Sequence, residues 1–240
     1  HYILEANKTA GTLPENAVAV KSIVSTEFTT KIAESYHVGM INVLTGFKFI
    51  AEQIQNFQDT NSHTFMFGFE ESYGYLIKPF VRDKDAIQAL TLLAEIAAYY
   101  RKQGKTLYDG LEGLYKEYGY FREQTIQQTF EGVEGPKKIE AIIQKFRDAA
   151  PKQFAGYDVV AVDDIAKGTK TFTDGHVEQL DLPHAEVLKY WLSDGTWIAV
   201  RPSGTEPKIK FYVGTNGATL SEANDKLQKF ADDINAFVAD

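Results

Sequence analysis

Short apolar runs alternate with helical spacings over the first half of the chain. Three runs are short and largely apolar, as buried strands are: 17–24, 40–44 and 64–69. Apolar residues at helical spacing follow the first two runs, and a longer helical pattern extends from Ala86 to Tyr100. This order of strands and helices predicts an α/β domain with a mixed sheet covered by helices. Because apolar residues nearly encircle the segment 86–100, we expect that helix to be packed deeply between layers.

The second half of the chain has a different pattern. Pro136 suits the first turn of a helix with one apolar stripe, and the segment 149–153 interrupts that pattern like a linker. Four apolar or alternating runs follow: 159–162, 187–192, 197–200 and 209–213. Asp194-Gly195 between two of these runs predicts a tight hairpin, and the last helical pattern is amphipathic. We therefore expect two domains, an α/β domain at 1–148 and a small antiparallel-sheet α+β domain at 155–240.

Composition narrows the class of protein. The chain has 240 residues, with 25 Lys and Arg against 33 Asp and Glu, which gives a formal charge of −8. This acidic balance, without a basic stripe, argues against a nucleic-acid partner. No apolar run reaches the ~18 residues that a membrane span needs, and the start of the chain lacks a secretory signal pattern. Because there is no Cys, a disulfide scaffold is excluded and a cytoplasmic protein is expected. The five His residues lack metal-ligand spacing, so we expect no metal site.

The segment 201–207 lies between two predicted strands and is too long for a minimal hairpin turn. It combines a guanidinium, two hydroxyls and a glycine that a ligand can approach closely: Arg201, Ser203, Thr205 and Gly204. The planar fork of Arg201 matches phosphate oxygens bidentately. Lys208 and Lys210 lie two apart on the following strand, so both face one side and can extend the positive field over a bound dianion. The same residues can also simply satisfy a surface connection, and their spacing leaves that alternative open.

A second candidate is the segment 68–75, which contains two consecutive carboxylates and a hydroxyl. Glu70 and Ser72 are two apart, so in extended geometry they project the same way, whereas Glu71 points elsewhere. A carboxylate beside a hydroxyl can accept and donate hydrogen bonds to vicinal hydroxyls, as on a sugar ring. The alternative interpretation is a strand end with a glycine-flanked turn.

Two further segments lie at the starts of predicted helices. Arg82-Asp83-Lys84-Asp85 opens the long apolar helix, where a charge cluster ordinarily serves capping and solvation. The segment 44–48 is a strand-to-helix junction, where backbone N–H groups can face an anion. The sequence has no Walker-type phosphate loop, no Gly-x-Gly-x-x-Gly and no Gly-x-Ser-x-Gly elbow.

Three of these segments together resemble the α-D-phosphohexomutase superfamily, and its phosphoglucomutase branch most closely. They are Gly-Phe-Glu-Glu-Ser-Tyr-Gly at 68–74, Arg-Asp-Lys-Asp at 82–85 and Arg-Pro-Ser-Gly-Thr-Glu-Pro at 201–207. The resemblance covers essentially the whole chain but corresponds only to the third and fourth domains of the family. In that family four domains line one cleft, and a phosphoserine exchanges its phosphoryl group with the sugar. The phosphoserine segment and the Asp-rich Mg²⁺ loop do not occur here, so the resemblance implies the C-terminal half of an enzyme, inactive by itself.

The resemblance also implies roles for individual residues. Lys84 matches a lysine proposed as an acid/base partner near the reacting hydroxyl. Glu70 and Ser72 match contacts to sugar hydroxyls, while Thr45 and Lys48 match a Thr-Gly-x-Lys junction whose role is less defined. The loop that grips the non-transferred phosphate, with a cation beside it, is matched by Arg201, Ser203, Gly204, Thr205 and Lys210. For the full-length enzyme the resemblance implies Mg²⁺ and glucose 1,6-bisphosphate as cofactors, neither bound by residues of this chain, and the missing N-terminal domains as partners.

The resemblance leaves the substrate open. The Glu-Glu-Ser form of the sugar-binding segment is similar to glucose-preferring members, which implies interconversion of glucose 1-phosphate and glucose 6-phosphate. Phe69 is similar to phosphopentomutase-like members, so a phosphomannomutase or phosphopentomutase fragment is an alternative. Two hypotheses from other classes are a non-catalytic sugar-phosphate-binding module and a structural interaction protein whose aromatic residues are all core.

Overall fold

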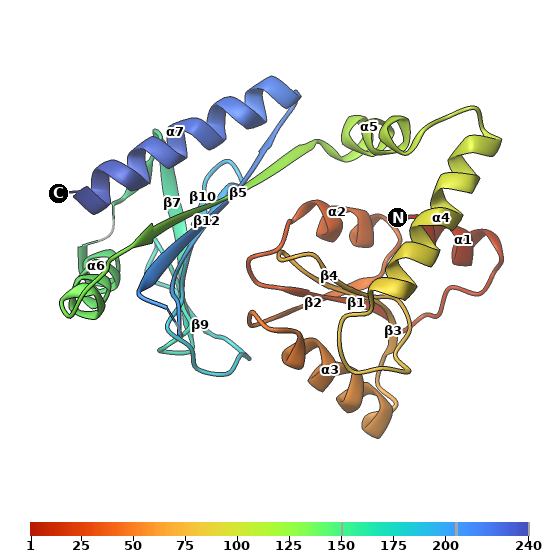
Figure 1. Cartoon of the computed structure of the whole chain (residues 1–240), viewed down its shortest axis with the longest axis horizontal. Helices are drawn as coiled ribbons and strands as arrows, with labels where there is room; N and C mark the ends of the chain where they lie inside the picture. The colour runs from red at the N-terminus through yellow and green to blue at the C-terminus, as the bar shows by residue number, and fades with distance from the viewer. Residues whose placement is uncertain (150, 205, 240) are drawn as a thin grey trace. The chain divides into compact units, whose positions relative to one another are not determined.

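The computed structural model describes residues 1–149, 151–204 and 206–239, which form two compact units. The first unit is His1–Gly119 and the second is Tyr120–Asp240. Each unit has its own sheet and its own hydrophobic core (Figure 1). The predicted combination of an α/β domain with an antiparallel α+β domain is confirmed. Among the described residues, no helix is both long enough and apolar enough to cross a membrane.

The first unit is built around a mixed sheet with the strand order β2-β1-β3-β4. Its strands are β1 (Ala17–Ser22), β2 (Gly39–Val43), β3 (Thr64–Glu70) and β4 (Gly74–Leu76). Strand β1 pairs in parallel with β2 and β3, and β4 returns antiparallel to β3. The helices are α1 (Tyr2–Thr9), α2 (Phe28–Ser35), α3 (Phe47–Thr60), α4 (Ala86–Lys102) and α5 (Leu107–Tyr118).

Helices cover both faces of this sheet, as a buried parallel sheet requires. Figure 1 shows α3 on one face and α2 on the other. The α3 face is closed by an apolar stripe at helical spacing that packs on β1, β2 and β4. Its buried residues are Phe47, Ile50, Ile54 and Phe57. On the other face, Leu4 of α1 and Ala33 of α2 pack with Met66 of β3.

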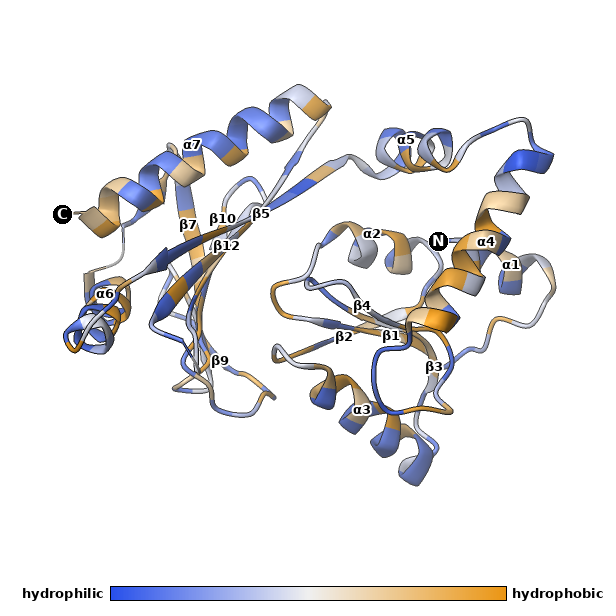
Figure 2. Ribbon diagram, viewed as in Figure 1, coloured by the Kyte–Doolittle hydropathy of each residue, from blue (hydrophilic) through white to orange (hydrophobic). Residues whose placement is uncertain are grey.

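Helix α4 is not packed deeply between layers, which corrects the expectation from its sequence. None of its residues is buried, and Ile87 and Leu90 are 73% and 62% exposed. Figure 2 shows hydrophobic colour along most of α4. The helix contacts β4 at its start, where the backbone N–H of Asp85 donates to Tyr75 O at 2.9 Å. Farther along, Tyr2 of α1 donates to Glu95 at 2.8 Å. An apolar sequence pattern indicates that a helix is stabilised by burial, but it does not show which part of the protein covers the helix.

The second unit consists of an antiparallel sheet with the strand order β5-β12-β11-β10-β7-β8-β9, and β6 pairs with β7. The strands are β5 (Tyr120–Thr129), β6 (Gln153–Phe154), β7 (Tyr157–Asp164), β8 (Thr169–Phe172), β9 (Val177–Gln179), β10 (Leu188–Leu192), β11 (Trp197–Pro202) and β12 (Lys208–Gly217). Helices α6 (Gly135–Ala149) and α7 (Leu220–Ala239) contribute Phe146 and Phe230 to the core on one face of this sheet. The predicted Asp194-Gly195 hairpin joins β10 to β11, with Gly195 at a φ of 83°.

The boundary between the units lies between Gly119 and Tyr120 instead of in the segment 149–153. Strand β5 pairs with β12 over its whole length, so it belongs to the second sheet. Helix α6 forms part of the same core, because Phe146 is fully buried among residues of the second unit. The sequence indicated the helix correctly, but its apolar stripe does not reveal which sheet it covers.

Candidate functional site

The carboxyl ends of β1, β2 and β3 meet at one edge of the first sheet. Ser22, the last residue of β1, lies opposite Val43, and Lys21 lies opposite Phe69. The segments 44–48 and 70–74 therefore leave the sheet at the same edge. In open α/β sheets, ligands bind outside the carboxyl ends of the strands. The topology thus brings two of the predicted segments to the edge at which a ligand site is expected.

Residues 70–74 form a tight hairpin between β3 and β4, called here the acidic hairpin. Glu70 is paired with Gly74, and Tyr73 has a φ of 63°, in the left-handed region that bulky residues rarely adopt. A Cβ at Gly74 would lie 2.6 Å from Glu70 Oε1, so the absent side chain makes room for the carboxylate. Glu70 is buried, whereas Ser72 is exposed.

Lys84 lies beside the start of α3. Its Nζ is 5.7 Å from the centroid of the Phe47 ring and 3.2 Å from Asp83 Oδ1, and half of its side chain is exposed. The backbone N–H of Lys84 donates to Asp83, and this bond together with the ammonium lowers the pKa of that carboxyl. Asp85 caps α4 by accepting from the N–H groups of Ile87 and Gln88 at 2.9 and 3.1 Å. The charge cluster therefore does cap the helix, and it also leaves the Lys84 ammonium accessible.

The junction after β2 contains two candidate residues that differ in exposure. Gly46 has a φ of 118° and precedes the first residue of α3. Thr45 is half-buried, and Lys48 is exposed with its Nζ 4.8 Å from the centroid of the Phe49 ring. Both residues lie at the same sheet edge as the acidic hairpin, as the parallel register requires.

In the second unit, Arg201 of β11 and Lys210 of β12 are direct cross-strand partners. Their strand neighbours Val200 and Ile209 are fully buried in the core beneath α6 and α7. Because side chains alternate along a strand, Arg201 and Lys210 project from the face of the sheet that is turned away from that core. Both are half-buried, so two cations are held side by side against the sheet.

The turn of the 201–207 loop is closed by its own polar groups. The N–H of Ser203 donates to Lys208 O at 2.8 Å, and the N–H of Glu206 donates to Ser203 Oγ at 3.3 Å. Gly204 is exposed, and a Cβ placed there would meet nothing within 4 Å. Lys208 Nζ donates to Glu206 Oε1 at 2.9 Å and lowers the pKa of Glu206. Thr205 lies outside the described residues.

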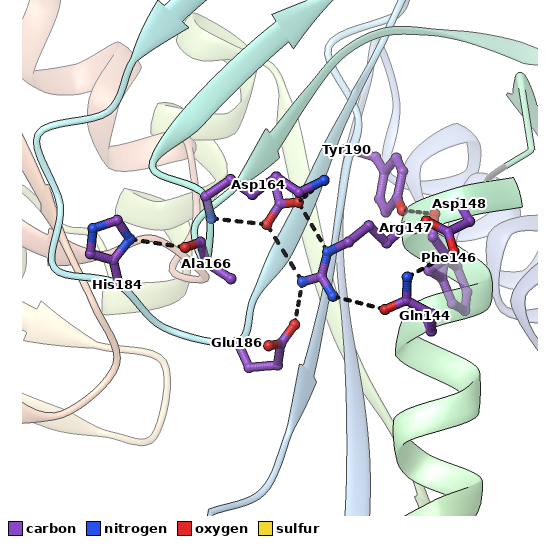
Figure 3. Close-up of polar contacts among 10 residues, drawn as sticks. Gln144, Phe146, Arg147, Asp148, Asp164, Ala166, His184, Glu186 and Tyr190 are labelled. Carbon is purple, nitrogen blue, oxygen red and sulfur yellow. Dashed lines mark hydrogen bonds and ion pairs between the residues drawn. The ribbon is translucent and has the colours of Figure 1, made fainter.

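A hollow of about 550 Å³ lies on the α6 side of this loop, but its charges do not suit a phosphate. Its lining includes three carboxylates, Glu140, Glu186 and Glu206. The guanidinium of Arg147 is already engaged by Asp164 at 3.0 Å and by Glu186 (Figure 3). These charges disfavour a dianion in the hollow, although Ser203 and Gly204 belong to its lining. Arg201 and Lys210 do not line the hollow, and their paired cations are the charges that would favour an anion at this loop.

No group of three or more His, Cys, Asp or Glu side chains suited to a metal ion occurs in the part of the chain that the structure describes. A divalent metal thus has no fitting donor set among these residues, and we assign no chemical step through one.

The candidates therefore gather in two places. In the first unit, Glu70, Ser72, Thr45 and Lys48 lie at the carboxyl ends of the parallel strands, and Lys84 lies beside the start of α3. The second unit brings together Arg201, Ser203, Gly204 and Lys210. The sequence did not predict two contacts of this region, the hydrogen bond from Ser22 to Glu71 and the approach of Lys84 to Phe47. Both contacts join residues that are far apart in sequence, so they depend on which strands are neighbours in the sheet. The sequence near each residue gives no signal for its partner.

Comparisons with known proteins match both units. Residues 1–118 match the family described as phosphoglucomutase/phosphomannomutase, alpha/beta/alpha domain III, and residues 131–234 match its C-terminal domain. A phosphoglucomutase of Staphylococcus haemolyticus is 38% identical over 230 residues, covering 95% of this chain and 41% of that protein. One from Staphylococcus epidermidis is 43% identical over 199 residues, covering 82% and 36%. The chain thus spans about two fifths of the length of these relatives.

Solved structures have a similar fold. The open form of pp63/parafusin, a phosphoglucomutase from Paramecium, superposes with a TM-score of 0.63 at 18% identity, covering 92% of this chain and 38% of that one. A putative phosphomannomutase from Thermus thermophilus superposes with a TM-score of 0.61 at 16% identity, covering 99% and 39%. At these identities the likeness concerns the fold alone.

Proposed function

Because the chain belongs to the phosphoglucomutase/phosphomannomutase family, we propose that it is the sugar- and phosphate-recognising part of a phosphoglucomutase that interconverts glucose 1-phosphate and glucose 6-phosphate. The observation that carries this proposal is the pair Arg201 and Lys210, held side by side at the base of the 201–207 loop. Relatives named phosphoglucomutase, at 38% and 43% identity, support glucose over mannose or pentose.

In this proposal the second unit grips the phosphate that is not transferred. The guanidinium of Arg201 donates two parallel hydrogen bonds to phosphate oxygens, and Lys210 neutralises the remaining charge. Ser203, Gly204 and Thr205 supply further donors around the same group. Such a grip has no preference for either end of the sugar, so it serves both orientations that a mutase must bind.

The first unit contributes the contacts to the sugar. Glu70 accepts from ring hydroxyls and Ser72 donates to them, both from the acidic hairpin. Lys84 gives or takes the proton of the reacting hydroxyl. Half of its side chain is exposed, so a ligand can reach its ammonium. Thr45 and Lys48 line the same edge. Phosphoryl transfer depends mainly on positioning and electrostatics, so recognition of this kind is a direct contribution to rate.

Mg²⁺ and glucose 1,6-bisphosphate act in the intact enzyme under this proposal. The metal would stabilise charge on the transferring phosphoryl group and the bisphosphate would keep the enzyme phosphorylated. The described residues contain no donor set for the metal. We therefore assign both groups to the remainder of the enzyme, which corresponds to the part of the relatives that this chain does not cover.

That remainder is also the proposed partner of α4. The exposed side chains of Ile87, Leu90 and Leu93 follow one another at three-residue spacing along the helix. Beside them is a hollow of about 680 Å³ with a largely apolar lining and one ammonium, that of Lys84. An exposed apolar surface of this kind marks an interface. We assign it to the N-terminal domains of the same enzyme.

An NMR titration of the 240-residue chain tests the phosphate assignment. Glucose 6-phosphate is expected to shift amide signals around Gly204, inorganic phosphate to shift many of the same signals, and glucose to shift none. Binding should be weak and should fall with salt, because the phosphate provides most of the interaction.

Two variants make this test specific. Arg201→Ala is expected to abolish the shifts, whereas Arg122→Ala, which removes a guanidinium from β5 of the same unit, should leave them unchanged. Parental binding of inorganic phosphate by Arg201→Ala, or inorganic-phosphate shifts that cluster outside 201–210, would show that the phosphate assignment is wrong.

A further inference from the structure

A chain of buried polar contacts connects the end of β1 to the acidic hairpin. Ser22 Oγ donates to Glu71 Oε2 at 2.7 Å, and Ser22 Oγ and Ser25 Oγ are 2.8 Å apart. The two serines are 1% and 2% exposed. Because the proton of Ser22 is used by the carboxylate, Ser25 is the donor in the bond between the two hydroxyls.

The base of this chain is held rigidly. Lys21 is fully buried, and its Nζ donates to Ser25 O at 3.2 Å and to Glu27 Oε1 at 3.0 Å. Glu27 also accepts from Thr30 of α2 at 2.7 Å. Strand β1 itself is paired on both sides. A buried polar network whose members all have partners favours a single arrangement, so Ser22 and Ser25 present their hydroxyls from a well-connected support.

The tip of the acidic hairpin has less support of its own. Only Glu71, Ser72 and Tyr73 separate the paired residues Glu70 and Gly74. Ser72 is exposed, and Tyr73 is 85% exposed while its backbone adopts a strained left-handed conformation. Strain in an exposed turn persists only where other contacts impose it. The bond from Ser22 to Glu71 is a side-chain contact that ties this turn back to the sheet.

We propose that Glu71 is a positioning residue: anchored by Ser22 and Ser25, it holds the acidic hairpin in its ligand-binding conformation and does not itself touch the ligand. The proposal rests on the proposed function, in which Glu70 and Ser72 contact a hexose phosphate. It divides the two consecutive glutamates by role, since Glu70 lies over Gly74 whereas Glu71 is turned toward β1.

The test uses the 240-residue chain and amide hydrogen exchange, which needs no ligand. Ser22→Ala is expected to raise the exchange rates of the paired strand β4, residues 74–76, about tenfold, the factor that corresponds to losing about 1.4 kcal/mol. Ser22→Thr keeps the hydroxyl and should restore the parental rates. Ser35→Ala is the matched control, because it removes a hydroxyl that donates within α2, to Ile32 O at 2.7 Å. Unchanged exchange at 74–76 in Ser22→Ala overturns the proposal.

A titration with glucose 6-phosphate then tests whether the anchor matters for binding. In the parent chain we expect amide shifts at 70–74. In Ser22→Ala these shifts should require a severalfold higher glucose 6-phosphate concentration. The shifts that inorganic phosphate causes at 201–210 should be unchanged. Faster exchange combined with parental sugar-phosphate shifts at 70–74 would refute the positioning role. Absence of shifts at 70–74 in the parent would refute the sugar-binding assignment and this proposal with it, while the phosphate assignment would stand on the 201–210 signals alone.

A second variant covers the case in which Ser22→Ala unfolds the first unit. Glu71→Ala changes a half-buried side chain in a turn and should reproduce the faster exchange and the weaker response. The double variant should be no worse than either single one, because both remove the same interaction. Additive effects would mean that Glu71 acts independently of Ser22, which contradicts the proposal.

Discussion

Removing residues 120–154 is expected to unfold the second unit, even though the remaining segment 155–240 contains most of its strands. The deletion takes away α6, whose buried side chains include Ile139, Ile143 and Phe146. Burying each side chain contributes about 1.5–3 kcal/mol, so the three together contribute about 5–9 kcal/mol. That is comparable to the entire 5–15 kcal/mol by which domains are usually stable. The deletion also removes β5 and leaves β12 with an unpaired edge.

The assay compares the fragments 120–240 and 155–240 by circular dichroism and urea unfolding. The longer fragment should unfold in one cooperative transition, and the shorter one should show none. Within 120–240, Phe146→Ala should cost about 3–5 kcal/mol, whereas Val133→Ala, at a position that is 91% exposed, should cost little. A cooperative transition of 155–240 with the same midpoint as that of 120–240 would refute the boundary between Gly119 and Tyr120.

Three further predictions concern Lys84, Asp164 and Gly214. In the intact enzyme, Lys84→Met should lower kcat by ~10²-fold or more, while thermal unfolding of the variant stays close to the parent; an unchanged kcat would leave Lys84 with a surface role. Although burial opposes it, the Arg147 bonds lower the pKa of Asp164 below its ordinary 3.8, so stability from this pair is present above that pH and lost as pH falls through the lowered pKa. Urea unfolding of 120–240 below pH 4 should therefore show a steeper loss of stability for the parent than for Asp164→Asn, and equal slopes would contradict this. Gly214→Ala would place a Cβ 2.3 Å from the buried Trp197 ring and should destabilise 120–240 by about 1–3 kcal/mol, whereas Gly204→Ala has open space and should be neutral.

Much of the fold follows from local pattern. Alternation along 209–213 predicted β12, and the Asp194-Gly195 turn between apolar runs predicted the β10–β11 hairpin. Strand β5 was not predicted, because polar residues dominate its sequence and only Phe121 is buried in it. Its place in the sheet is decided by pairing with β12, which lies far away in the sequence.

The candidate site divides in the same way. That Arg201 and Lys210 belong to one phosphate-binding region could be predicted, since the loop 201–207 and the strand after it are continuous in sequence, whereas their direct cross-strand pairing is seen only in the structure. The anchor of Glu71 could not, because the pairing of β1 with β3 brings Ser22 to it across 49 positions of sequence. The exposure of α4 was missed for another reason. Its apolar residues indicate that the helix favours burial. Only the three-dimensional structure shows that none of its residues is buried in this chain.

The pairing of β5 with β12 also sets the order in which the protein can fold during synthesis. The strands of the first unit lie within 17–76, so its sheet can form while the second unit is still being made. Strand β5 leaves the ribosome early but has to wait for β12, whose first residue follows 79 positions after Thr129. At about 5–20 residues per second the wait is roughly 4–16 s. During that time its unpaired edge can pair with other strands. The charged and amide side chains of β5, which prevented its prediction as a strand, also protect it from aggregation.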